Sequence, residues 1–488
     1  MVKSAFILFA ISCLTAISTA APVDTKTSAL VPNGNYIIQL NKETCIKHFV
    51  PKFMDGVLDL FTKHHNLTNV EKRGNRIVRR DTGDEQVNIF DAYDIGGSFK
   101  GIGVKLEHVD LVKSLLSVFN QDIINIVPDM DVKFNLPSMK ASSSKRLDRR
   151  EALTRVGNFN YDHYDHDENC PLGTKKKVAP ISAAKPNANV TASATYSSQS
   201  NPEWNLARVS QHTRDYTKPY VYDSTAGSGS YVYVVDDGMH TTHTDFGNRA
   251  TWGYTAYSGI SRLGGGHGTH VSGIIGGTTY GVAKKTNLIA VQVLDEDGSG
   301  AISAILSGLQ WVTNNAAARK GKAVINMSLG METDGNFTGV LKTFTDALSA
   351  VVDAGIPIIA AAGNSNTDTC KTLPAGNSDV FAVASSNKND YLSTFSCWGT
   401  CVQIIAPGES IKSTYISSTT STTTMSGTSM ASPHVAGVAA LLLPTLSNPT
   451  PANLYAKLTS IATKNAITSA LKGTPNLLLF NGQQLNSD

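Results

Sequence analysis

The sequence predicts an α/β protein with a parallel twisted sheet covered by helices on both faces, preceded by a small α+β unit. Three features support this prediction. Between Tyr231 and Ile461, short apolar strands alternate with segments of helical character. Most residues of these strands are apolar, which is typical of strands buried on both faces. A separate group of strands and helices lies at residues 35–135, before a polar stretch.

The first 20 residues have the pattern of a secretory signal peptide. Lys3 precedes an apolar run, Ala5–Ile17, and small residues then suit cleavage after Ala20 or Ala21. No later apolar run reaches the length of about 18 residues that a membrane-spanning helix needs. The formal net charge of +3 gives no reason to expect a nucleic-acid or membrane partner. We expect a secreted, extracellular monomer, with a vacuole or the cell wall as alternative destinations.

Residues 35–135 are predicted to form a separate N-terminal unit. Apolar residues recur at helical spacing in Phe49–His64 and Val109–Phe119. Strands are expected at Tyr36–Leu40, Phe99–Leu106, Ile123–Val127 and Met130–Phe134. The polar stretch Lys72–Glu85 is expected to be a loop. We interpret the order of these elements as a ferredoxin-like α+β sandwich.

Residues 136–196 are predicted to be a flexible linker. They are rich in Ser, Ala, Lys and Asn, and they contain basic pairs at Lys145-Arg146 and Arg149-Arg150 that would suit proteolytic processing. The segment Tyr161–Cys170 holds histidines among acidic residues. A solvated acidic run explains this segment better than a metal site, so no metal ligand is assigned.

Residues 197–488 are predicted to form the main domain. Its strands are expected at Tyr231–Val235, Leu288–Leu294, Ala323–Ser328, Pro357–Ala362, Val380–Ala384 and Val402–Ile405. Its helices are expected at Ile302–Ala317, Gly339–Ala354, Ser429–Leu443 and Pro451–Ile461. Because strands and helices alternate, the strands are expected to run parallel.

Three motifs place an acid, an imidazole and a hydroxyl at strand ends or helix starts. Asp236 follows the apolar run Tyr231–Val235, at the end of a parallel strand where ligand chemistry collects. His267 follows a glycine-rich turn and opens another apolar segment. Ser429 opens an apolar helix, whose dipole stabilises developing negative charge nearby. A serine becomes a good nucleophile when a base takes its proton and an acid orients that base, so this set predicts nucleophilic catalysis.

The motifs Asp236-Asp-Gly, His267-Gly-Thr-His and Gly427-Thr-Ser429-Met-Ala-Ser-Pro-His resemble those of the subtilisin-like serine proteases, especially the fungal proteinase K branch. Each motif alone is weak evidence, because Gly-Thr-Ser is usually a turn and His-Gly-Thr-His could bind a metal. Together, in this order, they are specific. The resemblance runs from about Ser197 to the C-terminus, and it also identifies the N-terminal unit as an inhibitory prodomain.

This resemblance implies a serine endopeptidase made as a zymogen. Its catalytic residues would be Asp236, His267 and Ser429. Its substrates would be polypeptides, no cofactor would be required, and its own prodomain would act as an intramolecular inhibitor and folding aid. His270 and His434 belong to the motifs, but we interpret both as structural.

The resemblance also assigns residues to the oxyanion and to the substrate backbone. Asn364, after the strand Pro357–Ala362, would donate its side-chain amide to the oxyanion, and such a donor is worth roughly 3–4 kcal/mol. Substrate would add as a strand between two segments. These segments are Gly298, Ser299 and Gly300 on one side and Ser328, Leu329 and Gly330 on the other.

Cysteines and asparagines fit a secreted protein. Five cysteines remain after the signal peptide: Cys45, Cys170, Cys370, Cys397 and Cys401. The resemblance implies a Cys370–Cys401 disulfide. Cys397 is then the candidate free thiol, or it pairs with Cys170, and the pairing of Cys45 is open. Glycosylation patterns occur at Asn66, Asn189 and Asn336, whereas Asn326 also matches but is expected to be buried.

Three positions depart from the resembled proteases. Asp237 stands where most proteinase K-like members have Thr or Ser, although kexin-type convertases carry Asp-Asp-Gly, and its charge would raise the pKa of His267. Glu332 and Asp334 follow the Ser-Leu-Gly segment and would favour a basic residue before the cleaved bond, against a default apolar-to-aromatic preference. Gln403 replaces an Asp of a calcium site, so we expect only weak structural calcium or none.

Two alternatives fit the same residues. One is a processing protease specific for basic residues, which peptide substrates differing in that residue would reveal. The other is a non-catalytic binding protein that keeps the fold, which a serine-hydrolase probe would reveal.

Overall fold

The computed structural model describes residues 34–64, 69–108, 111–134, 136, 196–333 and 338–483. The expected signal peptide and nearly all of the expected linker lie outside the described residues. So do Cys170, Asp334 and the glycosylation candidates Asn66, Asn189 and Asn336. Within the described part of the chain, no helix is both long enough and apolar enough to span a bilayer.

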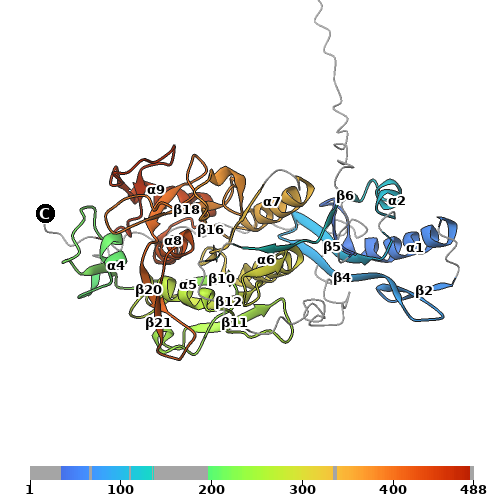
Figure 1. The fold of residues 1–488 in the computed structure, drawn as a ribbon, viewed down its shortest axis with the longest axis horizontal. Helices are drawn as coiled ribbons and strands as arrows, with labels where there is room; N and C mark the ends of the chain where they lie inside the picture. Colours follow the sequence, from blue (N-terminus) through green and yellow to red (C-terminus); the bar gives the residue numbers. More distant parts are fainter. Residues whose placement is uncertain are drawn as a thin grey trace, which may run out of the picture.

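Among the described residues, the main domain is built on a nine-stranded sheet (Figure 1). Its spatial order is β11 (Ala250–Thr255), β12 (Asn287–Gln292), β10 (Tyr231–Asp236), β14 (Ala323–Met327), β16 (Ile358–Ala361), β18 (Phe381–Ser386), β19 (Ile404–Pro407), β23 (Leu477–Leu478) and β22 (Thr463–Lys464). Neighbours pair in parallel from β11 to β23, and β22 pairs antiparallel with β23. The expected parallel sheet is confirmed, and each strand expected from the sequence is part of it.

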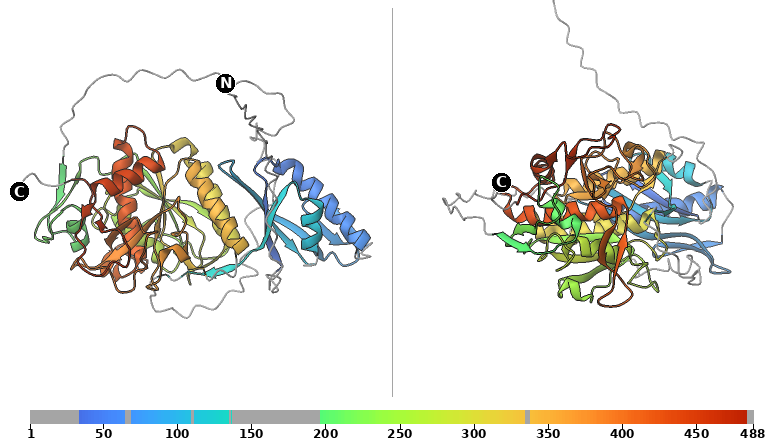
Figure 2. Two further views of the ribbon diagram at one scale, coloured as in Figure 1. Left: turned by 90° about the horizontal axis from the view of Figure 1, so that it is seen from above. Right: turned by 60° about the vertical axis from the view of Figure 1, so that its left-hand side comes forward.

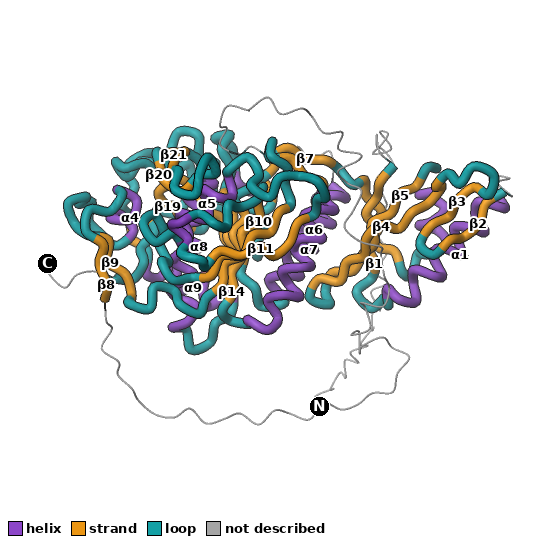
Figure 3. The backbone as a smooth tube through the Cα atoms, turned by 90° about the horizontal axis from the view of Figure 1, so that it is seen from below, coloured by secondary structure: helices purple, strands orange, loops and turns teal. Residues whose placement is uncertain are grey.

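Helices cover both faces of this sheet (Figure 3). They are α4 (Trp204–Val209), α5 (His267–Gly276), α6 (Ile302–Ala316), α7 (Thr338–Asp353), α8 (Thr428–Leu442) and α9 (Pro451–Ile461). On β10, Val232 and Val234 share a buried cluster with α5 and α8. The alternate residues, Tyr233 and Val235, share another cluster with α6 and α7. Because successive strand residues point to opposite faces, α5 and α8 cover one face and α6 and α7 the other.

Short strand pairs complete the main domain. They are β8 (Tyr196–Gln199) with β9 (Tyr220–Asp223), β15 (Met331–Glu332) with β17 (Thr372–Leu373), and β20 (Ile411–Thr414) with β21 (Thr422–Met425). A further short strand, β13 (Ser299–Ala301), pairs outside the main domain. The β15–β17 pair contributes to the candidate site described below, and β13 carries residues that the sequence assigned to substrate binding.

The N-terminal unit has a six-stranded antiparallel sheet within the described residues. Its order is β2 (Val70–Arg73), β3 (Arg76–Arg79), β4 (Glu85–Ile95), β5 (Phe99–Leu106), β1 (Asn35–Leu40) and β6 (Ile123–Pro128). Two helices, α1 (Ile46–His64) and α2 (Leu111–Val118), pack on one face, where Phe53, Leu115 and Ile102 share a buried cluster.

One expectation for this unit is wrong, because Lys72–Glu85 is not simply a loop. The stretch contains β3 and parts of β2 and β4. Ile77 and Val78 are buried while the arginines of the hairpin stay at the surface, and Gly74 makes the turn at a φ of 60°. Strands at the edge of a sheet commonly carry charged residues on their exposed side. The high polarity of this stretch was therefore compatible with a hairpin as well as with a loop. The ferredoxin-like assignment stays a prediction.

The second face of the N-terminal sheet packs against α6 and α7 of the main domain (Figure 2). Phe99 of the sheet and Phe344 of α7 belong to the same buried cluster. Asp129 accepts hydrogen bonds from the backbone N–H (2.9 Å) and the hydroxyl (2.6 Å) of Ser303 at the start of α6. Apolar burial and buried hydrogen bonds therefore join the two parts.

The segment Met130–Phe134 does not complete the N-terminal sheet, which corrects the expectation that it adds a strand there. Its strand β7 (Asp131–Lys133) pairs antiparallel with β13, with Lys133 opposite Ser299 and Val132 opposite Gly300. The backbone N–H of Phe134 also donates to the carbonyl of Gly298 at 3.0 Å. The N-terminal unit thus adds a strand to an edge of the main domain.

Candidate active site

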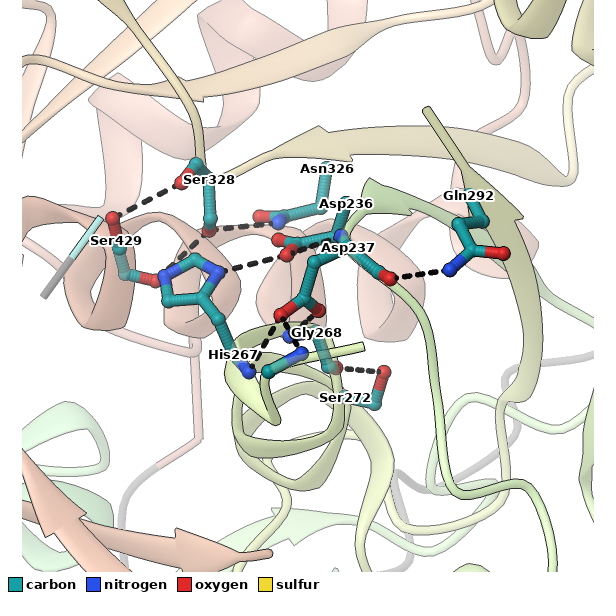
Figure 4. Close-up of polar contacts among 10 residues, drawn as sticks. Asp236, Asp237, His267, Gly268, Ser272, Gln292, Asn326, Ser328 and Ser429 are labelled. Carbon is teal, nitrogen blue, oxygen red and sulfur yellow. Dashed lines mark hydrogen bonds and ion pairs between the residues drawn. The ribbon is translucent and has the colours of Figure 1, made fainter. Parts of the chain in front are cut away.

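The acid and the base meet where β10 ends and α5 begins. Asp236 is the last residue of β10, and His267 is the first residue of α5. The Nδ1 atom of His267 lies 2.8 Å from Oδ1 of Asp236, and both side chains are buried (Figure 4). Gly266, before the helix, has a φ of 98°, and a Cβ there would lie 2.5 Å from the ring of Tyr415. The glycine-rich turn is therefore needed to bring His267 to Asp236.

The hydroxyl enters from α8. Ser429 is the second residue of this helix, and its Oγ donates to the carbonyl of Ser328 at 3.0 Å. The Nε2 atom of His267 has no hydrogen-bond partner among the described residues, and it points toward Ser429 (Figure 4). The three residues predicted from the motifs come together, but the Ser429–His267 hydrogen bond is not made. Such bonds are often long or misaligned until substrate binds.

The surroundings favour a protonated imidazole. Burial by itself lowers the pKa of His267. The charge of Asp236, its hydrogen bond and the charge of Asp237 outweigh burial and raise that pKa above its ordinary value of 6.5. An imidazole of this kind can accept a proton readily and hold it while bonds rearrange.

Asn364 lies in the same pocket as Ser429. Its Oδ1 accepts from the backbone N–H (2.8 Å) and the hydroxyl (2.9 Å) of Thr428. Because these bonds fix the amide oxygen, they orient the amide group of Asn364 as a whole, including its NH2. The hydroxyl of Thr428 also accepts the N–H of Gly363 at 3.1 Å.

The pocket beside Ser429 is lined by residues from four stretches of the chain: 328–332, 361–365, Thr372 and 428–429. Ser328, Leu329 and Gly330, which the sequence assigned to substrate binding, form one wall. Gly363 and Asn364 lie on another side, and the lining also includes Met331, Glu332, Ala361, Ser365, Thr372 and Thr428. Glu332 stands opposite Thr372 in the β15–β17 pair, so both side chains face the same side of that hairpin.

Gly298, Ser299 and Gly300, the other assigned segment, lie on the edge that β7 pairs with. This edge therefore accepts an extended backbone as an added strand, as the sequence predicted for substrate. Here the added strand is the chain's own segment.

The two other motif histidines serve the framework. The Nε2 atom of His270 bonds the carbonyls of Ile411 (3.1 Å) and Thr423 (3.2 Å). His434 bonds the carbonyl of Met430 through Nδ1 (2.7 Å) and the side chain of Asn205 through Nε2 (2.8 Å). Burial, with the charge of His267, lowers the pKa of His270 to about 3, and burial lowers that of His434 to about 4. Both rings stay neutral and structural, as expected.

Thr428 and Asn326 support the site, although the sequence analysis assigned neither of them to it. Asn326 is buried on β14, donates to the hydroxyl of Ser328 (2.9 Å) and accepts from Ser432 (2.8 Å). This burial agrees with the expectation that Asn326 stays unglycosylated. A hydroxyl directly before the nucleophile was a visible signal for Thr428, but its partner Asn364 is remote in sequence.

The cysteines follow the expectation in part. Cys370 and Cys401 form the expected disulfide. Cys397 is a buried free thiol, so the alternative pairing with Cys170 is wrong. Its Sγ lies 3.4 Å from the hydroxyls of Ser365 and Thr367, in a closely packed space. Cys45 is also disulfide-bonded.

The fold and the site define a serine endopeptidase of the subtilisin-like class. The Peptidase S8 model, described as the Subtilase family, matches residues 227–477. The chain therefore belongs to the subtilase family.

Relatives with known names support this placement. "Alkaline protease 1" of Aspergillus flavus is 43% identical over 286 residues, which cover 58% of this chain and 68% of the relative. "Subtilisin-like protease 2" of Pseudogymnoascus destructans is 36% identical over 375 residues, or 76% of this chain and 90% of the relative. The crystal structure of a cold-adapted subtilisin-like serine proteinase matches 58% of this chain and 99% of its own, with 40% identity and a TM-score of 0.53.

Proposed function

We propose that this protein is a secreted or luminal serine endopeptidase, made as a zymogen, that cleaves peptide bonds through Asp236, His267 and Ser429. The observation that supports this most is the 2.8 Å bond between Asp236 and His267, whose ring faces Ser429 (Figure 4), while Ser429 and Asn364 line one pocket. An acid–imidazole pair beside a hydroxyl and an amide donor matches the requirements of acyl transfer.

In the proposed reaction, the Ser429 hydroxyl first gives up its hydrogen bond to the carbonyl of Ser328. Its Oγ then attacks the carbonyl carbon of the substrate peptide and passes its proton to Nε2 of His267. The Asn364 amide and the backbone N–H of Ser429 hold the resulting oxyanion. His267 passes the proton to the leaving amine, and the C–N bond breaks to give an acyl-enzyme. Water, deprotonated by His267, then releases the acid and restores Ser429. Asp236 keeps the imidazole oriented throughout.

The N-terminal unit would act as an intramolecular inhibitor. Its strand β7 pairs with the edge proposed for substrate, so substrate and β7 compete for the same backbone groups. The 375-residue match to the Pseudogymnoascus relative is longer than residues 197–488, so it extends into the region before the main domain. Removal of this unit, after cleavage in the linker, would open the site.

For the residue before the cleaved bond, we propose a broad, apolar-to-aromatic preference. Gly330 and Gly363 line the pocket without side chains, which leaves room for a large flat group. A preference for basic residues is the second candidate, because Glu332 also lines the pocket and makes no ion pair within the described residues. Peptides that differ only in this residue distinguish the two.

We propose that catalysis needs no cofactor and that structural calcium is weak at most. The side-chain oxygen of Gln403 accepts the N–H of Ala382, so it does not fit the role of a free calcium ligand. Secretion is supported by the pattern of the first 20 residues, and one relative is named "Extracellular serine proteinase". We expect polypeptides as the only partners besides the prodomain.

Fluorophosphonate labelling of the secreted protein, followed by peptide mapping, tests this function. We expect the label on Ser429 and a mature N-terminus near Ser197. The Ser429→Ala protein should take no label and keep its N-terminal unit attached. An unlabelled wild-type protein after removal of that unit would instead indicate a binding protein that keeps the fold, and it would overturn the proposal.

A further inference from the structure

Asp237 has no role in the reaction proposed above, yet its carboxylate is buried next to the reacting residues. The residue is only 1% exposed. Oδ2 accepts the backbone N–H groups of Gly265 (2.9 Å) and His267 (3.2 Å). Oδ1 accepts the N–H of Gly268 at 2.8 Å. These amides belong to the turn before α5 and to its first residues. The first amides of a helix have no partner inside the helix, so a side chain that accepts them fixes where the helix begins.

We propose that Asp237 is a positioning residue, whose carboxylate holds the start of α5 and thereby keeps the imidazole of His267 in place for the reaction. The inference rests on the function proposed above. His267 is held at two points by consecutive residues of one strand end: its ring by Asp236 and its backbone N–H by Asp237. Two anchor points from one rigid strand restrict both the position and the direction of the imidazole.

The packing around Asp237 leaves little freedom for it to do anything else. A Cβ at Gly264 would lie 2.3 Å from the backbone oxygen of Asp237, and one at Gly268 would lie 3.0 Å from Oδ1. Gln292 also donates to the backbone oxygen of Asp237 at 2.8 Å. The carboxylate therefore sits in a cradle of backbone amides. An Asn in its place would turn an NH2 group toward N–H donors.

Burial and the charge of Asp236 raise the pKa of Asp237 to about 8, whereas the charge of His267 and the N–H groups of Gly268 and His267 favour the charged carboxylate. This charge in turn acts on His267. Against the lowering effect of burial, the charges of Asp236 and then Asp237 raise the pKa of His267. The other titratable groups nearby are His270 on α5, His434 on α8 and Tyr415 after β20, whose hydroxyl donates to Gly265. Glu296, in the loop beside Gly265, is exposed. Removal of the Asp237 charge should therefore lower the pKa of His267.

The test compares Asp237→Asn and Asp237→Ser in the full-length secreted protein. For Asp237→Asn we expect kcat to fall about tenfold or more with KM nearly unchanged, because a misplaced reacting group can cost up to about 10²-fold. The acid limb of the kcat/KM profile should move to lower pH in both variants. Ser can accept one N–H without presenting an NH2, so Asp237→Ser should recover part of kcat.

Asp245→Asn is the matched control. Asp245 accepts the N–H of Thr279 at 2.8 Å just beyond the other end of α5, away from the site. This variant should leave the acid limb where it is. Wild-type kcat and an unmoved acid limb in both Asp237 variants would overturn the inference. So would an equal loss in the Asp245→Asn protein, which would indicate a general effect on folding.

A readout that does not depend on turnover separates this inference from the proposed function. In a Ser429→Ala background, NMR of labelled histidine gives the pKa of His267 directly. That pKa should fall when Asp237 is replaced by Asn or Ser, and an unchanged value would refute the inference. Absence of peptidase activity in the wild-type protein would refute the proposed function alone.

Discussion

The hydrogen bonds around Asn364 allow a quantitative prediction about Thr428. The Thr428 hydroxyl donates to Oδ1 of Asn364 at 2.9 Å, while the Thr428 backbone N–H supplies a second bond at 2.8 Å. Thr428→Val removes one of these two bonds, together with the bond that the hydroxyl accepts from Gly363, and nearly preserves the shape of the side chain. A neutral hydrogen bond contributes about 0.5–1.5 kcal/mol, so kcat should fall about two- to twelvefold. Asn364→Ala removes the proposed oxyanion donor itself, and kcat should fall about 10²–10³-fold.

The assay is steady-state hydrolysis of a chromogenic peptide by the matured protein. KM should stay nearly constant in both variants, because the oxyanion donor acts in the transition state. Thr428→Ser keeps the hydroxyl and should remain close to wild type. The double variant Thr428→Val/Asn364→Ala should be no slower than Asn364→Ala alone, because Thr428 acts through Asn364. A wild-type kcat for Thr428→Val, or losses that multiply in the double variant, would refute this reasoning.

Three further predictions concern pH, stability and specificity. Activity requires neutral His267, and the charge of Asp236, among other effects, raises the pKa of His267 despite burial. The value of kcat/KM should therefore fall as the pH drops through a midpoint above 6.5. A midpoint below 6.5 would contradict the effect assigned to the neighbouring carboxylates. Asp390→Ala would leave Arg208 buried without its carboxylate partner, which lies at 2.9 Å. In urea titrations of the inactive Ser429→Ala protein, this change should lower the free energy of unfolding by about 3–5 kcal/mol. A loss below about 1 kcal/mol would show that Arg208 finds water or another partner. Glu332→Gln should reduce the cleavage rate of peptides with lysine before the cleaved bond, relative to those with leucine there, by about two- to fivefold. The effect is small because an exposed ion pair between Glu332 and a substrate lysine contributes little free energy. An unchanged ratio of the two rates would exclude the preference for basic residues.

Much of the site could be predicted because its parts are local sequence patterns. Asp236 ends an apolar strand, and Ser429 opens an apolar helix. Parallel strands of one sheet bring such ends to one edge, so alternation of strand and helix already implied that these residues converge. The hairpin at residues 70–79 was missed because polarity was taken as evidence for a loop.

What the sequence by itself determined is the class of fold, the identity of the reactive groups and their order along the chain. Only the tertiary structure decided which groups contact the reactive ones and the substrate edge. Asp237 accepts hydrogen bonds at the start of α5, Thr428 donates to Asn364, and β7 pairs with β13. The physical reason is that strand and helix periodicity arises from neighbouring residues, whereas hydrogen bonds and strand pairing join residues that are distant in sequence. Their geometry depends on distances of a few tenths of an ångström, which only the packed molecule sets.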